Sequence, residues 1–294
     1  MTPADSLPQL HAQRHTLKLP HIHLSYIEWL QGDEPVLFLH GLADNAMVWA
    51  SAGECLRDRY HSVALDLRGH GDSSKPEQGY SCTDVITDLN ALMQHLGWTS
   101  AHVVAHSWAA KVALVWARQQ PDRVRSLVLV DPAFINKMPG WMRLTFPLFY
   151  RVLSFLRTIG PFETYEQAEA QAKQLKQYRG WSPLQQLAFQ SGTEQKPNGQ
   201  WGSKFVVQAR DGVFEDVLSV AALTQSLDLP ILLIQPELGL NRTSRHLQPY
   251  RRYLTNLTIQ KVVGNHWCFL GEPAAFNQAI VTFLDRQRQP QIEG

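Results

Sequence analysis

One stretch in the middle of the chain restricts the possible folds more than any other. Residues 102–105 form a short apolar run typical of a buried strand in a parallel sheet, and the run stops at Ser107. A helical pattern over residues 108–118 begins at once. A serine between a strand and a helix, with a small residue two positions before and after it, is typical of a nucleophile elbow. Here both small residues are alanine where glycine is usual, and the alternative is a serine that caps the helix.

Strand and helix patterns alternate on both sides of this stretch. Two edge strands are expected at residues 17–19 and 22–30, and buried strands at residues 36–39, 61–65, 102–105, 127–130, 231–234 and 257–263. Residues 133–227 interrupt the alternation with helical runs and an Asn198-Gly199 hairpin turn. The order predicts an open, mostly parallel α/β sheet that carries a mainly helical cap.

This organisation divides the chain into three parts. We expect an α/β core made of residues 15–132 and 228–294, a helical cap or lid at residues 133–227, and a loose arm at residues 1–14.

Composition excludes several classes of function. The net charge of +1 without a long basic run argues against a nucleic-acid partner. Cys55, Cys82 and Cys268 are scattered, so we expect neither a disulfide framework nor a zinc site. We expect no secretory signal, because the first residues have neither a basic nor an apolar segment, and no membrane span, because no run reaches the ~18 apolar residues that one needs. The chain is therefore expected to be cytoplasmic, without a metal or other cofactor.

A nucleophilic serine needs a base and two donors for the oxyanion. His266 follows the last predicted strand directly, at the sheet edge where the crevice of an open α/β sheet lies, so it could meet Ser107 there. The alternative is that His266 is a structural residue whose hydrogen bonds only hold its loop. The backbone N–H groups of Trp108, at the helix start, and of Leu42, in the loop after residues 36–39, are the candidate oxyanion donors.

Four short motifs in this order resemble those of the α/β hydrolase fold. They are His40-Gly41-Leu42, the stretch from Asp66 to Ser73, His106-Ser107-Trp108, and Asn265-His266-Trp267 followed by Glu272-Pro273. The resemblance covers residues 20–285 and implies an eight-stranded sheet with the cap inserted after strand 6. It implies that Ser107 is the nucleophile, His266 the base, and Leu42 and Trp108 the oxyanion donors. A serine at this place argues against the dehalogenase and epoxide-hydrolase branches, which use aspartate.

The resemblance leaves the acid behind His266 open. The family usually supplies an aspartate after the strand at residues 231–234, but the only carboxylate in that loop is Glu237. Asp131 ends the preceding strand, where some family members carry their acid. It could instead fix the turn into the cap. We take Asp131 as the first candidate and Glu237 as the alternative.

The cap sequence bears on the substrate. Residues 141–157 are aromatic and aliphatic with spaced arginines, which predicts an apolar wall over the site and would allow transient lipid contact. Packing against the core is the alternative. Trp141, Phe146 and Trp267 are the candidate substrate contacts.

The sequence therefore predicts a serine hydrolase of a small hydrophobic ester, acting through an acyl-enzyme. One alternative is that the same residues hydrolyse a C–C bond or a thioester, or catalyse a lyase reaction. The other is a non-catalytic binding protein with the same fold.

Overall fold

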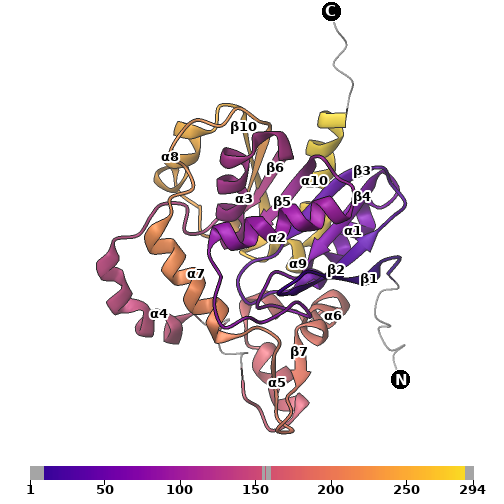
Figure 1. Cartoon of the computed structure of the whole chain (residues 1–294), viewed down its shortest axis with the longest axis vertical. Helices are drawn as coiled ribbons and strands as arrows, with labels where there is room; N and C mark the ends of the chain where they lie inside the picture. Colours follow the sequence, from indigo (N-terminus) through magenta and orange to yellow (C-terminus); the bar gives the residue numbers. More distant parts are fainter. Residues whose placement is uncertain (1–9, 154–155, 157–159, 289–294) are drawn as a thin grey trace, which may run out of the picture.

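An eight-stranded sheet forms the centre of the protein in the computed structural model, which describes residues 10–153, 156 and 160–288 (Figure 1). The strand order is β1-β2-β4-β3-β5-β6-β9-β10. Strand β2 runs antiparallel to its neighbours β1 and β4, whereas β4, β3, β5, β6, β9 and β10 run parallel to one another. Their bounds are β1 Gln13–Lys18, β2 His23–Trp29, β3 Glu34–Leu39, β4 Tyr60–Leu65, β5 Ala101–His106, β6 Val124–Val130, β9 Ile231–Leu238 and β10 Leu257–Asn265.

The predicted fold class is confirmed, including the two antiparallel strands at one edge. The first two residues of β1 belong to the stretch expected as an arm, because Gln13 and Arg14 already pair with β2. Residues 1–9 of that arm lie outside the described residues.

Helices cover both faces of the sheet and divide the core in two. In β3, Leu37 and Leu39 face one hydrophobic cluster, while Val36 and Phe38 face the other, as alternating side chains on a strand must. Outside the cap, the α-helices that pack into the first cluster are α2 (Cys82–His95), α3 (Trp108–Gln119) and α8 (Ser244–Tyr253). Those that pack into the second are α1 (Ala50–Leu56), α9 (Cys268–Gly271) and α10 (Pro273–Arg288).

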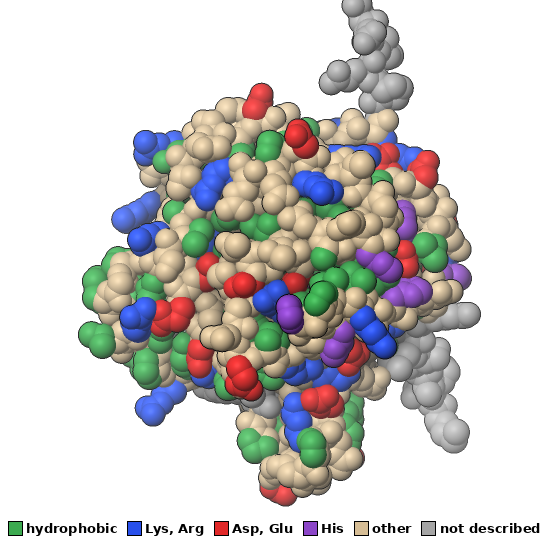
Figure 2. All heavy atoms as spheres, viewed as in Figure 1, with side chains coloured by type: hydrophobic (Ala, Val, Ile, Leu, Met, Phe, Trp, Pro, Cys, Tyr) green, Lys and Arg blue, Asp and Glu red, His purple; other side chains and the backbone are tan. Residues whose placement is uncertain are grey.

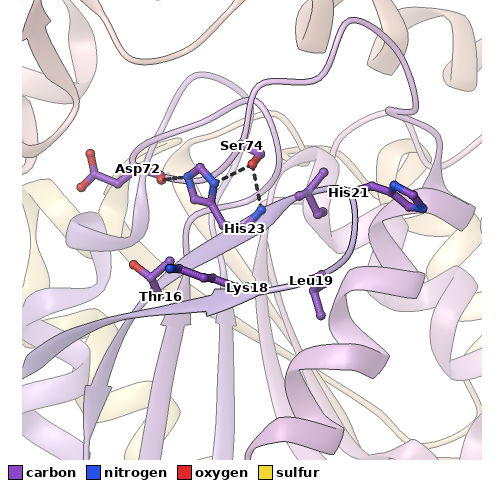
Figure 3. A pocket seen from close by; sticks show the side chains of 8 residues that line it. Thr16, Lys18, Leu19, His21, His23, Asp72 and Ser74 are labelled. Carbon is purple, nitrogen blue, oxygen red and sulfur yellow. Dashed lines mark hydrogen bonds between the residues drawn. The ribbon is translucent and has the colours of Figure 1, made fainter.

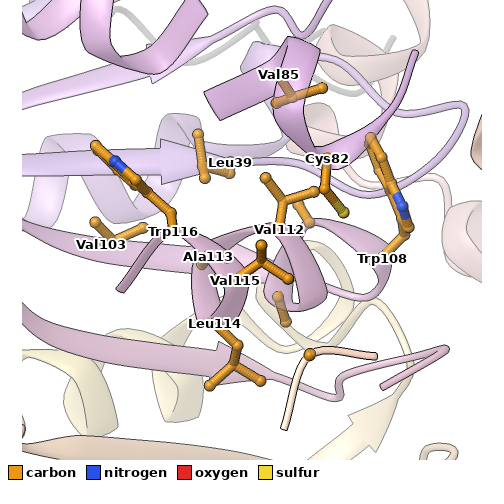
Figure 4. Packing of buried hydrophobic residues seen from close by; sticks show 14 of the residues in the cluster. Leu39, Cys82, Val85, Val103, Trp108, Val112, Ala113, Leu114, Val115 and Trp116 are labelled. Carbon is orange, nitrogen blue, oxygen red and sulfur yellow. The ribbon is translucent and has the colours of Figure 1, made fainter. Parts of the chain in front are cut away.

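Helix α3 is apolar on nearly all sides and is buried accordingly. Val112 and Trp116 of α3 are fully buried, in a cluster that also holds Leu39 of β3 and Val85 of α2 (Figure 4). Burial of each such large side chain stabilises the fold by about 1.5–3 kcal/mol. The helix that follows Ser107 is therefore held in place by the core.

The cap lies between β6 and β9. Its elements are η3 Gly140–Thr145, α4 Phe146–Val152, α5 Tyr165–Ala172, η5 Lys176–Tyr178, α6 Pro183–Ser191, β7 Thr193–Gln195, β8 Trp201–Ser203 and α7 Val207–Ser219. Strands β7 and β8 form the hairpin that the sequence predicted, and Gly199 in the turn has φ of 85°, a conformation that favours glycine. In Figure 1, α4 and α7 lie at the left of the sheet, and α5, α6 and β7 lie below it.

Among residues 10–153 and 160–288, no helix is long and apolar enough to cross a membrane.

Candidate active site

Ser107 lies in the tight turn between β5 and α3, as expected from the sequence. Its φ of 55° and ψ of −119° are unfavourable for a residue with a side chain and cost about 1–3 kcal/mol. Backbone bonds hold the turn, since Ser107 N donates to Val130 O at 3.0 Å and Ala133 N donates to Ser107 O at 3.1 Å. Ala105 and Ala109 are buried, which agrees with the need for small side chains there.

The loop after β3 lies directly beside Ser107. A Cβ added to Gly41 would lie 2.6 Å from Nδ1 of His106 and 3.2 Å from Cβ of Ser107, so the loop approaches this closely only because residue 41 is glycine. The N–H groups of Leu42 and Trp108 form no hydrogen bond within the part of the chain that the structure describes. Two free donors next to a serine are what an oxyanion hole requires.

His266 follows β10 and is oriented by a carboxylate. Its Nδ1 lies 2.6 Å from Oδ2 of Asp131, which is fully buried at the end of β6. Burial alone would raise the pKa of Asp131. The hydrogen bond and the charge of His266, together with hydrogen bonds donated by Leu240 and Asn241, instead hold this pKa below its usual value. An ionised carboxylate can only accept, so the histidine proton lies on Nδ1 and Nε2 remains free to act as a base.

The loop after β9 completes the surroundings of Asp131. Oδ1 accepts from Asn241 N at 3.1 Å and from Asn241 Nδ2 at 2.9 Å, and Leu240 N donates to both oxygens, at 2.8 Å to Oδ2 and 3.0 Å to Oδ1. A Cβ on Gly239 would lie 2.5 Å from Oδ2 of Asp131, so this glycine lets the backbone reach the carboxylate. The hydrogen bonds from this loop lower the free energy needed to bury the negative charge of Asp131.

The structure brings Asp131, and not Glu237, to His266. The side chain of Glu237 is exposed at the end of β9 and forms no hydrogen bond or ion pair with any residue described by the structure. Sequence reasoning did not find Asn241; an asparagine shortly after a strand end was the signal available.

A cavity of about 690 Å³ opens onto this site and is lined by Ser107, His266, Leu42 and Trp267 among others. Its walls are largely apolar and include side chains from the cap and from α8, namely Phe134, Ile135, Leu153, Phe214, Pro249 and Tyr250.

Two of the three predicted substrate contacts lie elsewhere. Trp141 is 66% exposed on η3, and Leu144 and Leu148 are exposed as well. Figure 2 shows hydrophobic side chains gathered at the left of the view, where α4 lies in Figure 1. Phe146 is buried and packs edge-on against Phe214, with ring centroids 5.1 Å apart. Neither is among the residues that line the cavity, because η3 and the start of α4 turn their aromatic rings to solvent or into the cap. Trp267 does line it.

A buried polar group lies behind the site and was not predicted. Asp44, four residues after His40, accepts a bond of 3.1 Å from Nε1 of Trp267. Its carboxylate is 3.5 Å from Nδ1 of His106, whose Nε2 donates to the carbonyl of His266 at 3.0 Å. Burial raises the pKa of Asp44 to about 6 and holds the pKa of His106 well below its usual value. Asp44 and His106 therefore link the loop after β3 to the loop that carries His266.

A second hollow of about 530 Å³ lies at the sheet edge beside His21 and His23 (Figure 3). His23 uses both ring nitrogens for structure, since Nε2 donates to Asp72 O at 3.1 Å and Nδ1 lies 2.9 Å from Ser74 Oγ. His21 also lines the hollow, and its ring lies apart from that of His23 in Figure 3. Residues 10–153, 156 and 160–288 contain no cluster of three side chains suited to a metal ion.

Sequence comparisons find relatives that are named as hydrolases. A 2-(acetamidomethylene)succinate hydrolase of Mesorhizobium japonicum is 39% identical over 102 residues, which are 34% of this chain and 37% of that protein. A serine hydrolase-like protein of Danio rerio is 25% identical over 274 residues, or 88% of this chain and 84% of that protein. The chain thus spans little more than a third of the first relative.

Solved structures show the same fold. The structure of E-2-(acetamidomethylene)succinate hydrolase matches with a TM-score of 0.76 at 23% identity, covering 94% of this chain and 100% of that one. A marine microorganism esterase matches with a TM-score of 0.72 at 21% identity, covering 88% and 98%. A family model described as the alpha/beta hydrolase fold matches residues 34–235, more than half of the chain. The chain therefore belongs to the α/β hydrolase fold family.

Proposed function

We propose that this α/β hydrolase is a serine esterase that cleaves a carboxylic ester with an apolar acyl or alkyl part. The observation that carries the proposal is the bond of 2.6 Å between His266 Nδ1 and Asp131, at a cavity that Ser107 also lines. Because this bond leaves Nε2 without a proton, His266 can accept the proton of the serine hydroxyl.

The reaction follows from these positions. Ser107 Oγ attacks the ester carbonyl carbon while His266 Nε2 takes the hydroxyl proton, and the N–H groups of Leu42 and Trp108 stabilise the oxyanion. The C–O bond to the alcohol then breaks, and the alcohol leaves with the proton from His266. Water, deprotonated by His266, attacks the acyl-enzyme, and release of the acid restores Ser107.

Three features support an ester substrate with an apolar part. The cavity walls are mainly apolar, as in sites that bind small hydrophobic molecules. The nucleophile position holds serine, and each residue that the mechanism needs lies within or beside one cavity. A solved esterase and a serine hydrolase-like relative share the fold or the sequence pattern.

Hydrolysis of 4-nitrophenyl esters of two to ten carbons tests the proposal. We expect nitrophenolate release by the wild type and a loss of at least ~10³-fold in kcat for Ser107→Ala, with the melting temperature of the variant close to that of the wild type. Release that is equal in wild type and Ser107→Ala would contradict it.

A further inference from the structure

The opening of the active-site cavity carries basic side chains and no acidic ones. Lys176 of η5 and Arg245 and His246 of α8 line the cavity, and all three side chains are exposed, which places them at its rim. No aspartate or glutamate is among the described residues that line this cavity. We call these three residues the cationic rim.

The two permanent cations of the rim have no partner among the residues that the structure describes. Neither Lys176 nor Arg245 forms a side-chain hydrogen bond or an ion pair with any residue in the described ranges, whereas Arg68, Arg125 and Lys204 each pair with a carboxylate. Within the described residues, the positive charge at the cavity opening is therefore not paired with a carboxylate.

The position of Arg245 adds a second argument. Arg245 and His246 occupy the first turn of α8, a helix of ten residues whose first turn holds no acidic residue. The N-terminus of a helix carries a partial positive charge, so basic side chains are unfavourable there unless an anion is near. Helix dipole and side chains together make one electropositive area on this side of the cavity.

The opposite side is held close to the catalytic histidine. Asn265, the residue before His266, donates from Nδ2 to the carbonyl of Lys176 at 2.9 Å. This bond fastens η5, which belongs to the cap, beside the loop that carries the base. Lys176 and α8 therefore approach the same opening from two separate parts of the fold.

We propose that the substrate is an ester that also carries a carboxylate, with its apolar part inside the cavity and the carboxylate at the cationic rim. The inference rests on the proposed esterase function and adds the charge of the substrate to it. The apolar walls accept the chain between the two groups, and the unpaired cations accept the anionic end.

A matched pair of esters tests this inference. Mono-4-nitrophenyl pimelate ends in a carboxylate, while its methyl ester has the same chain and no charge, and both release nitrophenolate. The readout is the ratio of kcat/KM for the anionic ester to that for the neutral ester. We expect a ratio above one, which falls about 5- to 30-fold in Arg245→Gln or Lys176→Gln, mainly through KM.

Arg242→Gln is the matched control variant. Arg242 is exposed just before α8 and is not among the residues that line the cavity, so this variant should keep the wild-type ratio. Because the rim is exposed, added salt should lower the wild-type ratio as well. A ratio that is the same in wild type, Arg245→Gln and Lys176→Gln, with hydrolysis still dependent on Ser107, would overturn the anionic substrate and leave the esterase proposal intact.

Binding separates the two proposals when hydrolysis fails. Calorimetry of octanoate and octanol with Ser107→Ala should show tighter binding of the carboxylate, and Arg245→Gln added to Ser107→Ala should remove that difference. If no ester is hydrolysed but this difference is found, the esterase proposal fails and the anion site stands. If octanoate and octanol bind alike, the anion site is refuted.

Discussion

Replacement of Asp131 by asparagine should abolish the base without unfolding the protein. Two N–H donors, Asn241 N and Asn241 Nδ2, bind Oδ1 of Asp131, and Leu240 N lies within reach of both carboxylate oxygens, so the amide oxygen of the variant should stay at Oδ1, where it can accept from all three. The amide NH₂ group then takes the place of Oδ2, which now accepts from Nδ1 of His266 at 2.6 Å. Since the NH₂ group donates, Nδ1 must accept and the histidine proton moves to Nε2.

A histidine protonated on Nε2 cannot accept the proton of Ser107. In the Ser-His-Asp proteases the same change lowers kcat about 10⁴-fold, which corresponds to about 5 kcal/mol in the activation barrier. We expect Asp131→Asn to have an effect of that order on 4-nitrophenyl butyrate. Loss of one charge-assisted bond costs about 1.5–3 kcal/mol of stability, so the variant should fold with a melting temperature only several degrees lower.

Glu237→Gln is the control, because that side chain is exposed and separate from His266. Its kcat should be within about twofold of the wild type. The role of Asp131 is refuted if Asp131→Asn keeps more than a tenth of the wild-type kcat while circular dichroism shows a folded protein, or if Glu237→Gln loses as much activity as Asp131→Asn.

Three further variants test other parts of the structure. Gly41→Ala places a Cβ 3.2 Å from Cβ of Ser107 and should displace the oxyanion loop, which lowers kcat about 10²- to 10³-fold; an unchanged kcat would count against that loop. The pKa of Asp44 is raised to about 6, so the folded state binds the proton more tightly than the unfolded state, and stability falls as the pH rises from about 4 to 6. This loss of stability approaches about 3 kcal/mol, and Asp44→Asn removes it. The variant should therefore exceed the wild type in melting temperature by more at pH 8 than at pH 5. An equal difference at the two pH values would contradict the raised pKa of Asp44. Lys111→Ala leaves buried Asp216 without the cation 3.5 Å away and should cost about 3–5 kcal/mol in urea denaturation, whereas a cost below 1 kcal/mol would mean that the pair is not buried in solution.

Local patterns were enough to predict the fold and the positions of Ser107 and His266. The run at residues 102–105 is typical of a buried strand, and the ends of parallel strands meet at one edge of the sheet, so the serine after β5 and the histidine after β10 could be expected to meet there. The cap was predicted because residues 133–227 lack the apolar runs of such strands.

Contacts that depend on the path of a loop could not be predicted from the sequence. The choice between Asp131 and Glu237 depends on Gly239, which lets Leu240 and Asn241 turn back onto the end of β6. Nothing in the spacing of residues shows this turn. Trp141 was expected at the substrate, but an apolar residue in a cap helix can face the cavity, the core or solvent, and the periodicity is the same in all three cases.

Covalent labelling of Ser107 tests the account most directly. A fluorophosphonate probe loses fluoride when an activated serine attacks its phosphorus, so labelling reports the nucleophile whatever the natural substrate is. We predict one adduct by intact mass, on the peptide that contains Ser107, with no adduct in Ser107→Ala and labelling at least ~100-fold slower in His266→Ala. A wild-type protein that stays unlabelled, or a Ser107→Ala variant that is labelled as fast as the wild type, would contradict it.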